Sequence, residues 1–413
     1  MATALLVLGV VGIFCTANAL RPRVRGSWFA VPSFFVAWPV GELAPQVIVL
    51  QALGALVLIL LGALDSWPGW VGLGLGLVSW AGLAVLVRQA GRTDDLVEVA
   101  LRAGLGDVPV VSHARSASLL RLATALPLPD KRVEVVRDLR YADGAGKRHL
   151  LDVYRPAAAA EQPPLAGAPV LVQVHGGAWI IGDKRQQALP LMHHLAANGW
   201  VCVAPNYRLS PKATFPDHLV DVKLALKWVR EHVAEYGGDP SFVVITGGSA
   251  GGHLASLVAL TAGDPEYQPG FEEVDTSVVA CIPFYGAYDL LGRHGGRGAD
   301  GMYGGAARWL MKADPVADRA AFERASPLDR IGPQAPPFMV VHGTLDSLVP
   351  IAEGRAFAAG LREQSTEPVV YLELPGAEHA FEVFHSIRSE ATVRGVHRFL
   401  EHVRTTHRSP RLD

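Results

Sequence analysis

The sequence predicts an α/β fold, a mostly parallel central sheet with helices on both faces, preceded by about three transmembrane helices. Two observations predict this class. After residue 130, short apolar runs alternate with amphipathic stretches of helical period, which is the pattern of parallel strands joined by helical crossovers. Before residue 90, long stretches carry no charged side chain, and half of the 413 residues are hydrophobic.

The first 90 residues are predicted to anchor the chain in a membrane. Three uncharged stretches each approach the ~20 apolar residues that a helix needs to cross a bilayer. They are residues 1–20, 43–64 and 66–87. Residues 26–41 are also uncharged, but this stretch is shorter, contains two prolines and is rich in Trp and Phe, so we expect it at the membrane interface.

Charges near the span ends predict the orientation. Three arginines follow the first stretch and two follow the third, whereas a single acidic residue separates the second stretch from the third. These arginines are Arg21, Arg23, Arg25, Arg88 and Arg92. Because positive charges near span ends tend to stay cytoplasmic, we expect an integral protein of the cell membrane with its N-terminus outside and residues 88–413 in the cytoplasm.

The first stretch has an alternative interpretation as a cleaved signal peptide. Ala17-Asn18-Ala19 is similar to a cleavage site. Signal peptides, however, carry positive charge before their apolar segment, and here the arginines come after it. The charge pattern therefore favours a retained span and leaves the cleaved form as the alternative.

Residues 91–130 turn polar and are predicted to form a linker with helices. Thr93-Asp94-Asp95 is typical of a helix N-terminus, and two glycines mark the end of the helical pattern. Such helices could cover the active site as a cap. A catalytic domain is then expected over residues 131–405, followed by a short tail at 406–413.

Within the predicted catalytic domain, apolar runs of strand length alternate with helical patterns. The first two strands are expected to form an antiparallel hairpin and the others a parallel sheet. The expected strands are residues 133–142, 149–154, 169–174, 200–204, 242–246, 278–284, 337–341 and 369–374. The expected helices are residues 186–198, 217–235, 250–262, 351–364 and 390–405. An insertion at residues 290–330 either shapes substrate access or is a variable surface loop.

Two glycine-rich motifs predict a serine nucleophile and an oxyanion hole. Gly247-Gly248-Ser249-Ala250-Gly251 lies between a predicted strand and a predicted helix. In such a turn the glycines provide room where a side chain would meet neighbouring elements. His175-Gly176-Gly177-Ala178-Trp179 follows another predicted strand. Its two glycines let backbone N–H groups point into a pocket, where they can bind the negative oxygen formed when an acyl carbonyl is attacked.

A serine nucleophile needs a base and an orienting acid, which with this motif follow in the order Ser, Asp or Glu, His. Asp346 lies in the loop after the predicted strand at 337–341, and His379 follows the last predicted strand. Glu378 is the alternative acid, but a residue adjacent to the base in sequence usually points elsewhere. We therefore predict Asp346 as the acid and His379 as the base that serve Ser249.

Other polar residues are assigned plainer roles. We expect His175 and His253 to support the oxyanion turn and the start of the following helix, and His342 to be structural. The three cysteines have no spacing of a disulfide framework or a zinc site, so no metal is expected. A net charge of −2 and the absence of any Lys/Arg run argue against nucleic acid as a partner.

These motifs resemble the hormone-sensitive-lipase-like branch of the α/β-hydrolases, carboxylesterases whose oxyanion loop reads His-Gly-Gly-x-Trp or similar. The resemblance runs over residues 131–405 and implies an α/β-hydrolase fold. It also implies backbone N–H donors to the oxyanion at Gly176, Gly177 and Ala250. One position departs from the pattern, because many members have Asp before the nucleophile where this chain has Gly248. The resemblance further includes residues 204–211, 215–217 and 236–240.

The combined prediction is a membrane-anchored serine carboxylic-ester hydrolase that forms an acyl-enzyme with a small-molecule or lipid ester. It needs no metal or organic cofactor. Formamidase-type amide hydrolysis is the alternative that the same resemblance allows. A non-catalytic α/β-hydrolase-fold module is a further alternative, although such modules usually lose a member of the triad. The sequence alone predicts neither an acyl length nor an oligomeric state.

Overall fold

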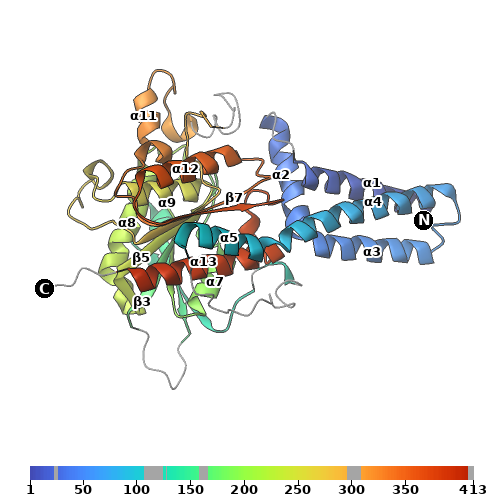
Figure 1. Cartoon of the computed structure of the whole chain (residues 1–413), viewed down its shortest axis with the longest axis horizontal. Coiled ribbons are helices and arrows are strands. Elements are labelled where there is room, and N and C mark those ends of the chain that lie inside the picture. Colours follow the sequence, from blue (N-terminus) through green and yellow to red (C-terminus); the bar gives the residue numbers. More distant parts are fainter. Residues whose placement is uncertain (23–26, 107–123, 127, 158–165, 295–307, 408–413) are drawn as a thin grey trace.

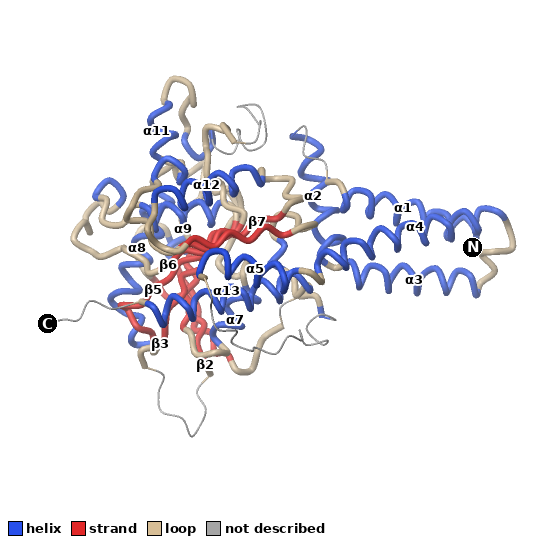
Figure 2. The backbone as a smooth tube through the Cα atoms, viewed as in Figure 1, coloured by secondary structure: helices blue, strands red, loops and turns tan. Residues whose placement is uncertain are grey.

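The sheet and its covering helices form one body, from which the N-terminal helices project (Figure 1). The computed structural model describes residues 1–22, 27–106, 124–126, 128–157, 166–294 and 308–407. Figure 2 shows the strands as a twisted layer between two layers of helices. This is the layered α/β architecture that the alternating pattern predicts.

Eight strands in the described residues form one sheet in the order β1-β2-β4-β3-β5-β6-β7-β8. β1 is antiparallel to β2 and β2 to β4, whereas the remaining pairs are parallel. The bounds are β1 Val133–Arg140, β2 Leu150–Pro156, β3 Ala168–Val174, β4 Val201–Pro205, β5 Gly238–Gly248, β6 Ala280–Phe284, β7 Phe338–Gly343 and β8 Val369–Leu374. All eight predicted strands and the predicted hairpin are confirmed. Helices cover both faces of the parallel strands, which explains why these strands are continuous apolar runs.

Helices bury a separate apolar core on each face of the sheet. Their bounds are α7 Leu189–Ala196, α8 Asp217–His232, α9 Ala250–Leu260, α12 Ile351–Gln364 and α13 Ile387–Thr406. α8, α9 and α12 cover one face, where Leu254 and Phe357 are buried. α7 and α13 cover the other, where Leu191 and Val396 are buried. Shorter segments are α11 Arg319–Arg324, η1 Gly146–His149, η2 Val233–Tyr236, η3 Pro265–Tyr267, η4 Pro327–Arg330 and η5 Phe381–Val383.

The helix predicted as a possible cap, α5 Thr93–Leu105, lies on the sheet instead. It packs against β8 and α13, and a Cβ on Gly104 would lie 2.7 Å from the side chain of Val370. Glu98 also pairs with Arg398 of α13 at 2.7 Å. The apolar side of α5 therefore completes a face of the sheet, and a cap formed by residues 91–130 stays a prediction. Most of the predicted linker beyond α5 lies outside the described residues.

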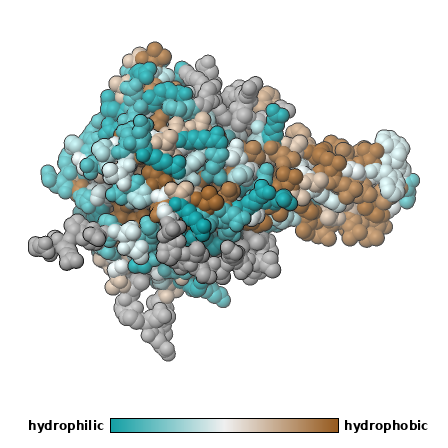
Figure 3. Space-filling view, in the orientation of Figure 1, coloured by the Kyte–Doolittle hydropathy of each residue, from teal (hydrophilic) through white to brown (hydrophobic). Residues whose placement is uncertain are grey.

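The projecting bundle consists of apolar helices. They are α1 Ala2–Leu20, α3 Ala44–Leu60 and α4 Trp67–Ala90, and all three predicted spans are thus helical. α1 and the helix that begins at Trp67 are long and apolar enough to cross a membrane. α3 meets this criterion only together with α2, Ser27–Glu42, across an 88° bend. Figure 3 shows hydrophobic side chains covering most of the visible face of the bundle.

Small residues let α1 and α4 pack closely. Gly9 faces the carbonyl group of Gly72, and a Cβ on Gly72 would lie 2.5 Å from the backbone of Leu5. Thr16 Oγ1 and Ser79 Oγ share a hydrogen bond of 2.8 Å between the two helices. Close backbone contact and interhelical hydrogen bonds are the forces that join helices in lipid, where the hydrophobic effect between helices is absent.

α2 leaves the bundle and lies against the catalytic body. Phe34 is buried in the same core as α13. Trp38 Nε1 donates a hydrogen bond of 2.9 Å to the carbonyl oxygen of Ala380. Glu42, at the end of the helix, is 4% exposed. The apolar helix expected at a membrane interface therefore has a protein surface as one of its neighbours.

Candidate active site

Ser249 lies on the turn between β5 and α9, at the carboxyl ends of the parallel strands. Its φ of 58° and ψ of −121° are a conformation that L-residues avoid, which is expected of a nucleophile on a sharp strand-to-helix turn. A Cβ on Gly247 would lie 2.7 Å from the carbonyl oxygen of Val174, and one on Gly251 would lie 2.7 Å from that of His175. Only glycine fits at these two positions, as the motif predicts.

The glycine directly before the nucleophile also has a structural reason. A Cβ on Gly248 would lie 2.7 Å from the hydroxyl oxygen of Tyr285 and 3.0 Å from its ring. The ring centroid of Tyr285 lies 4.4 Å from that of His379. The lack of a side chain at position 248 thus leaves room for an aromatic side chain between the serine turn and His379.

Asp346 and His379 form a buried pair. His379 Nδ1 lies 2.8 Å from Asp346 Oδ2, so the Nδ1–H tautomer donates to the carboxylate and leaves Nε2 as the basic atom. Asp346 Oδ1 accepts hydrogen bonds from the backbone N–H groups of Leu348, at 2.9 Å, and Val349, at 2.7 Å. Among the described residues there is no hydrogen bond between Ser249 Oγ and His379, a contact that in free enzymes is often long and shortens with substrate bound.

The pair is electrostatically coupled. Burial raises the pKa of Asp346, but the charge of His379 and hydrogen bonds from His342 and His379 outweigh burial and hold it well below its ordinary value. Burial lowers the pKa of His379, but the neighbouring carboxylate outweighs it, so the net pKa is raised. Asp346 therefore stays ionised and stabilises the protonated imidazole.

Glu378, the alternative acid, occupies a different place. Its Oε1 accepts hydrogen bonds from the backbone N–H groups of Ser347, at 2.7 Å, and His379, at 2.8 Å. Burial, and then the charge of Asp346, raise its pKa to about 8. Glu378 is thus mostly protonated near pH 7 and contacts the backbone of His379, whereas Asp346 contacts the imidazole.

The oxyanion loop follows β3 and has an unusual backbone. Gly177, Ala178 and Trp179 have φ values of 114°, 51° and 60°. The N–H of Gly176 donates to Gln187 Oε1 at 2.6 Å, so this predicted donor is already occupied. The N–H groups of Gly177 and Ala178, and that of Ala250 across the site, have no hydrogen-bond acceptor within the described part of the chain. Sequence reasoning missed Gln187, which no motif marks.

Two histidines support this loop as predicted. His175 stacks on Tyr207 with ring centroids 4.3 Å apart, and its Nδ1 lies 2.8 Å from the carbonyl oxygen of Gly176. His253 Nδ1 accepts a hydrogen bond of 3.2 Å from Trp179 Nε1, and its Nε2 donates to a backbone carbonyl at 2.8 Å. Burial lowers the pKa of each histidine to about 4, so both are neutral supports of the turn.

His342, predicted to be structural, contacts the acid itself. Its Nε2 lies 3.2 Å from Asp346 Oδ2 and 3.1 Å from the carbonyl oxygen of Val349. Asp346 Oδ2 thus lies within reach of two imidazoles. The spacing His-Gly-x-x-Asp, which places a histidine at the end of β7 and the acid in the next turn, is the signal that could have revealed this contact.

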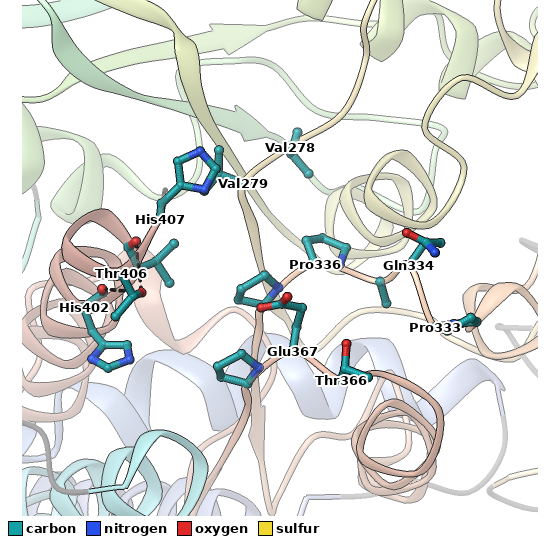
Figure 4. A pocket seen from close by; sticks show the side chains of 14 residues that line it. Val278, Val279, Pro333, Gln334, Pro336, Thr366, Glu367, His402, Thr406 and His407 are labelled. Carbon is teal, nitrogen blue, oxygen red and sulfur yellow. Dashed lines mark hydrogen bonds between the residues drawn. The ribbon is translucent and has the colours of Figure 1, made fainter. Parts of the chain in front are cut away.

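A surface hollow of about 630 Å³ lies away from these residues (Figure 4). Val278, Pro337 and Pro368, which precede β6, β7 and β8, line it together with residues at the end of α13. The hollow therefore opens at the opposite end of the parallel strands from Ser249 and is separate from the candidate site. Within the described residues, no cluster of His, Cys, Asp and Glu could hold a metal ion.

Residues 151–361 match the family described as BD-FAE, and this range is just over half of the chain. It includes Ser249 and Asp346, and His379 lies beyond it. The chain belongs to the BD-FAE family of α/β-hydrolase carboxylesterases.

The relatives it resembles are named as esterases and carboxylic ester hydrolases. This esterase is 42% identical to the probable carboxylic ester hydrolase LipM of Mycobacterium tuberculosis, over 97% of this chain and 93% of that protein. It is 46% identical to esterase LipQ of the same organism over 70% of this chain and 67% of that protein. A solved esterase of Thermogutta terrifontis with propionate bound is 27% identical, with a TM-score of 0.52 over 68% of this chain and 97% of that one.

Proposed function

We propose that this carboxylesterase is membrane-anchored and uses Ser249 as nucleophile, His379 as base and Asp346 as orienting acid. The observation that carries the proposal is the 2.8 Å contact between Asp346 and His379. Both residues lie on loops at the carboxyl ends of the strands, where the strained Ser249 turn also lies. A strained backbone at a serine between a strand and a helix is typical of a nucleophile turn.

In this mechanism His379 Nε2 takes the proton of Ser249 Oγ as that oxygen attacks the ester carbonyl carbon. The N–H groups of Gly177, Ala178 and Ala250 stabilise the oxyanion. The N–H of Gly176 instead holds the loop in place through its hydrogen bond to Gln187. His379 then gives the proton to the leaving alcohol. An acyl-enzyme remains, and water activated by His379 releases the acid.

The substrates we propose are small-molecule or lipid esters with short to medium acyl chains. The Thermogutta relative was solved with propionate, a short acyl product, which supports this range. We expect little action on emulsions of long-chain triglycerides. A p-nitrophenyl ester panel graded in acyl length, in matched detergent, measures this, and faster turnover of the longest chains contradicts it.

Labelling with a fluorophosphonate tests the nucleophile. We expect the wild type and Ser256→Ala, a change in the helix after the turn, to be labelled, and Ser249→Ala to be unlabelled. Ester turnover of Ser249→Ala is expected to fall on the order of 10^3 to 10^6-fold, because triad members act as a unit. Near-native turnover by folded Ser249→Ala overturns the mechanism.

A matched pair of variants tests the acid. Asp346→Asn keeps the shape of the side chain but holds His379 in the wrong tautomer, with an expected loss of up to about 10^4-fold in turnover. Glu378→Gln retains an oxygen for the two backbone N–H groups, so its loss is expected to be small. The reverse ranking identifies Glu378 as the acid.

A further inference from the structure

The segment between β8 and α13, residues 375–386, carries His379, and we call it the base loop. We propose that α2 positions this loop, so that Trp38 and Glu42 are positioning residues for the reaction. The inference rests on the proposed role of His379 as base. It makes a helix next to the membrane anchor an integral part of the active site.

Trp38 holds the backbone directly after the base. Its Nε1 donates a hydrogen bond of 2.9 Å to the carbonyl oxygen of Ala380. Ala380 has a φ of 59°, a left-handed conformation that a non-glycine residue keeps only when its surroundings hold it there. The Trp38 ring also packs on Phe384 with centroids 4.8 Å apart. One side chain of α2 therefore contacts the base loop on both sides of η5.

Glu42 ties the two ends of the same loop. Ser386 Oγ donates to Glu42 Oε2 at 2.8 Å, and Arg388 Nη1 forms an ion pair with Glu42 Oε1. Arg388 Nη2 in turn donates to the carbonyl oxygen of Pro375 at 3.2 Å. The two charged side chains are each 1% exposed. A buried ion pair is a weak source of net stability but enforces one arrangement, since misplacing either charge leaves the other unpaired.

The ring of Phe34 contacts both Trp38 and the imidazole of His379. It stacks on Trp38 with centroids 5.3 Å apart and meets the imidazole of His379 edge-on at 6.2 Å. Phe34 is 7% exposed. α2 therefore supplies an apolar wall beside the imidazole as well as the polar contacts that hold its loop.

The test uses the full chain in detergent and compares two tryptophan variants. Trp38→Phe keeps an aromatic ring and removes the indole N–H. Trp70→Phe is the matched control, because Trp70 Nε1 also donates to a backbone carbonyl, that of Leu64, at 3.0 Å, at the far end of the bundle. Rates are normalised to active sites titrated to completion with fluorophosphonate, so unfolded protein does not contribute to them.

We expect Trp38→Phe to lower kcat and the rate of phosphonylation about tenfold, with KM within about twofold, because a slight displacement of the base slows proton transfer. Trp70→Phe is expected to match the wild type in all three. Equal kcat values for Trp38→Phe and Trp70→Phe overturn the inference. Absence of labelling in the wild type instead contradicts the proposed function, so the two failures are distinguishable.

Phe34→Leu provides a second readout while keeping an apolar side chain. Removing the ring admits water to the imidazole and relieves its desolvation, so the acid limb of the kcat/KM profile is expected to move to higher pH. The other groups that face His379, namely Asp346, Tyr285, Glu378 and Glu382, are unchanged. A profile identical to that of the wild type contradicts the role of α2 as a wall of the site.

Discussion

Gly248 has no side chain, and this allows Tyr285 to pack beside the Ser249 turn. Tyr285 fills the space that a Cβ would need, and the same ring lies against His379. The hydroxyl of Tyr285 is buried and lies in the electrostatic environment of Glu382 and Asp346. The space behind the serine turn is therefore packed by an aromatic ring, which a side chain at position 248 would displace.

Gly248→Ala tests this packing. The new methyl group would overlap Tyr285, and we expect a loss of about 1–3 kcal/mol in stability together with about tenfold lower kcat/KM, because Tyr285 must move against His379. Gly332→Ala is the control, since a Cβ there meets nothing within 4 Å. Thermal unfolding and ester turnover measure both effects. If the two variants behave alike, Tyr285 does not restrict position 248.

Glu378 makes stability depend on pH. Its pKa is raised from 4.5 to about 8 by burial, so between these values the folded protein keeps a proton that the unfolded chain releases. The folded state binds more protons there, and its stability therefore falls as pH rises. We expect the Tm of Glu378→Gln, relative to that of the wild type, to rise between about pH 5 and about pH 8. Each kcal/mol of unfolding free energy that the wild type loses over this range corresponds to roughly 2–4 °C in Tm. Glu363→Gln, on the exposed side of α12, is the control, and its Tm is expected to differ from that of the wild type by a constant amount across this range. A constant Tm difference for Glu378→Gln as well contradicts the raised pKa of Glu378.

At the scale of elements, the parallel strands could be predicted from the sequence because buried parallel strands are continuous apolar runs, whereas β1 is a charged and mostly exposed antiparallel edge strand. The sequence predicted Ser249, Asp346 and His379 from motifs and chain order, and the structure brings Asp346 and His379 into contact. It did not predict where α2 lies, since a helix rich in Trp and Phe has the same composition whether lipid or protein covers it. Gln187 was missed for another reason: its contact with Gly176 depends on a fold of the loop that spacing alone does not describe.

The bundle offers a test of helix packing. Gly72 and Gly74 lie on α4, but a Cβ on Gly72 would overlap α1, whereas one on Gly74 meets nothing within 4 Å. We expect Gly72→Leu to reduce stability by about 1–3 kcal/mol or to expose the bundle to proteases, because the helices must separate. Gly74→Leu is expected to resemble the wild type. Equal thermal unfolding of the two variants in detergent shows that α1 and α4 do not pack this closely.

At the scale of the whole molecule, the anchor and the catalytic body share contacts as well as a chain. α5 continues from α4 onto the sheet, and α2 reaches the base loop. The arginines after the first and third spans favour placing both connections on one side of the membrane. We propose that the catalytic body lies on the same side of the membrane as these arginines, in the cytoplasm.

Reporter fusions after residue 405 test this orientation. Alkaline phosphatase needs an oxidising exterior for activity, so we expect that fusion to be inactive and a fusion to a cytoplasmic fluorescent protein to be bright. A fusion of alkaline phosphatase in the loop between α3 and α4 serves as the opposite control and is expected to be active. An inverted pattern for the three fusions overturns the orientation.

The ion pair between Glu42 and Arg388 joins residues 346 positions apart in the chain. A ribosome adds about 5–20 residues per second, so the carboxylate is made on the order of tens of seconds before its partner exists. An unpaired charge is costly to bury, so we expect the Glu42 end of α2 to stay in contact with water or lipid headgroups during that interval. The base loop thus receives its support only after the last helix has been translated. A chain that ends before Arg388 therefore lacks the ion pair with Glu42, and with it the contact that joins the two ends of the base loop.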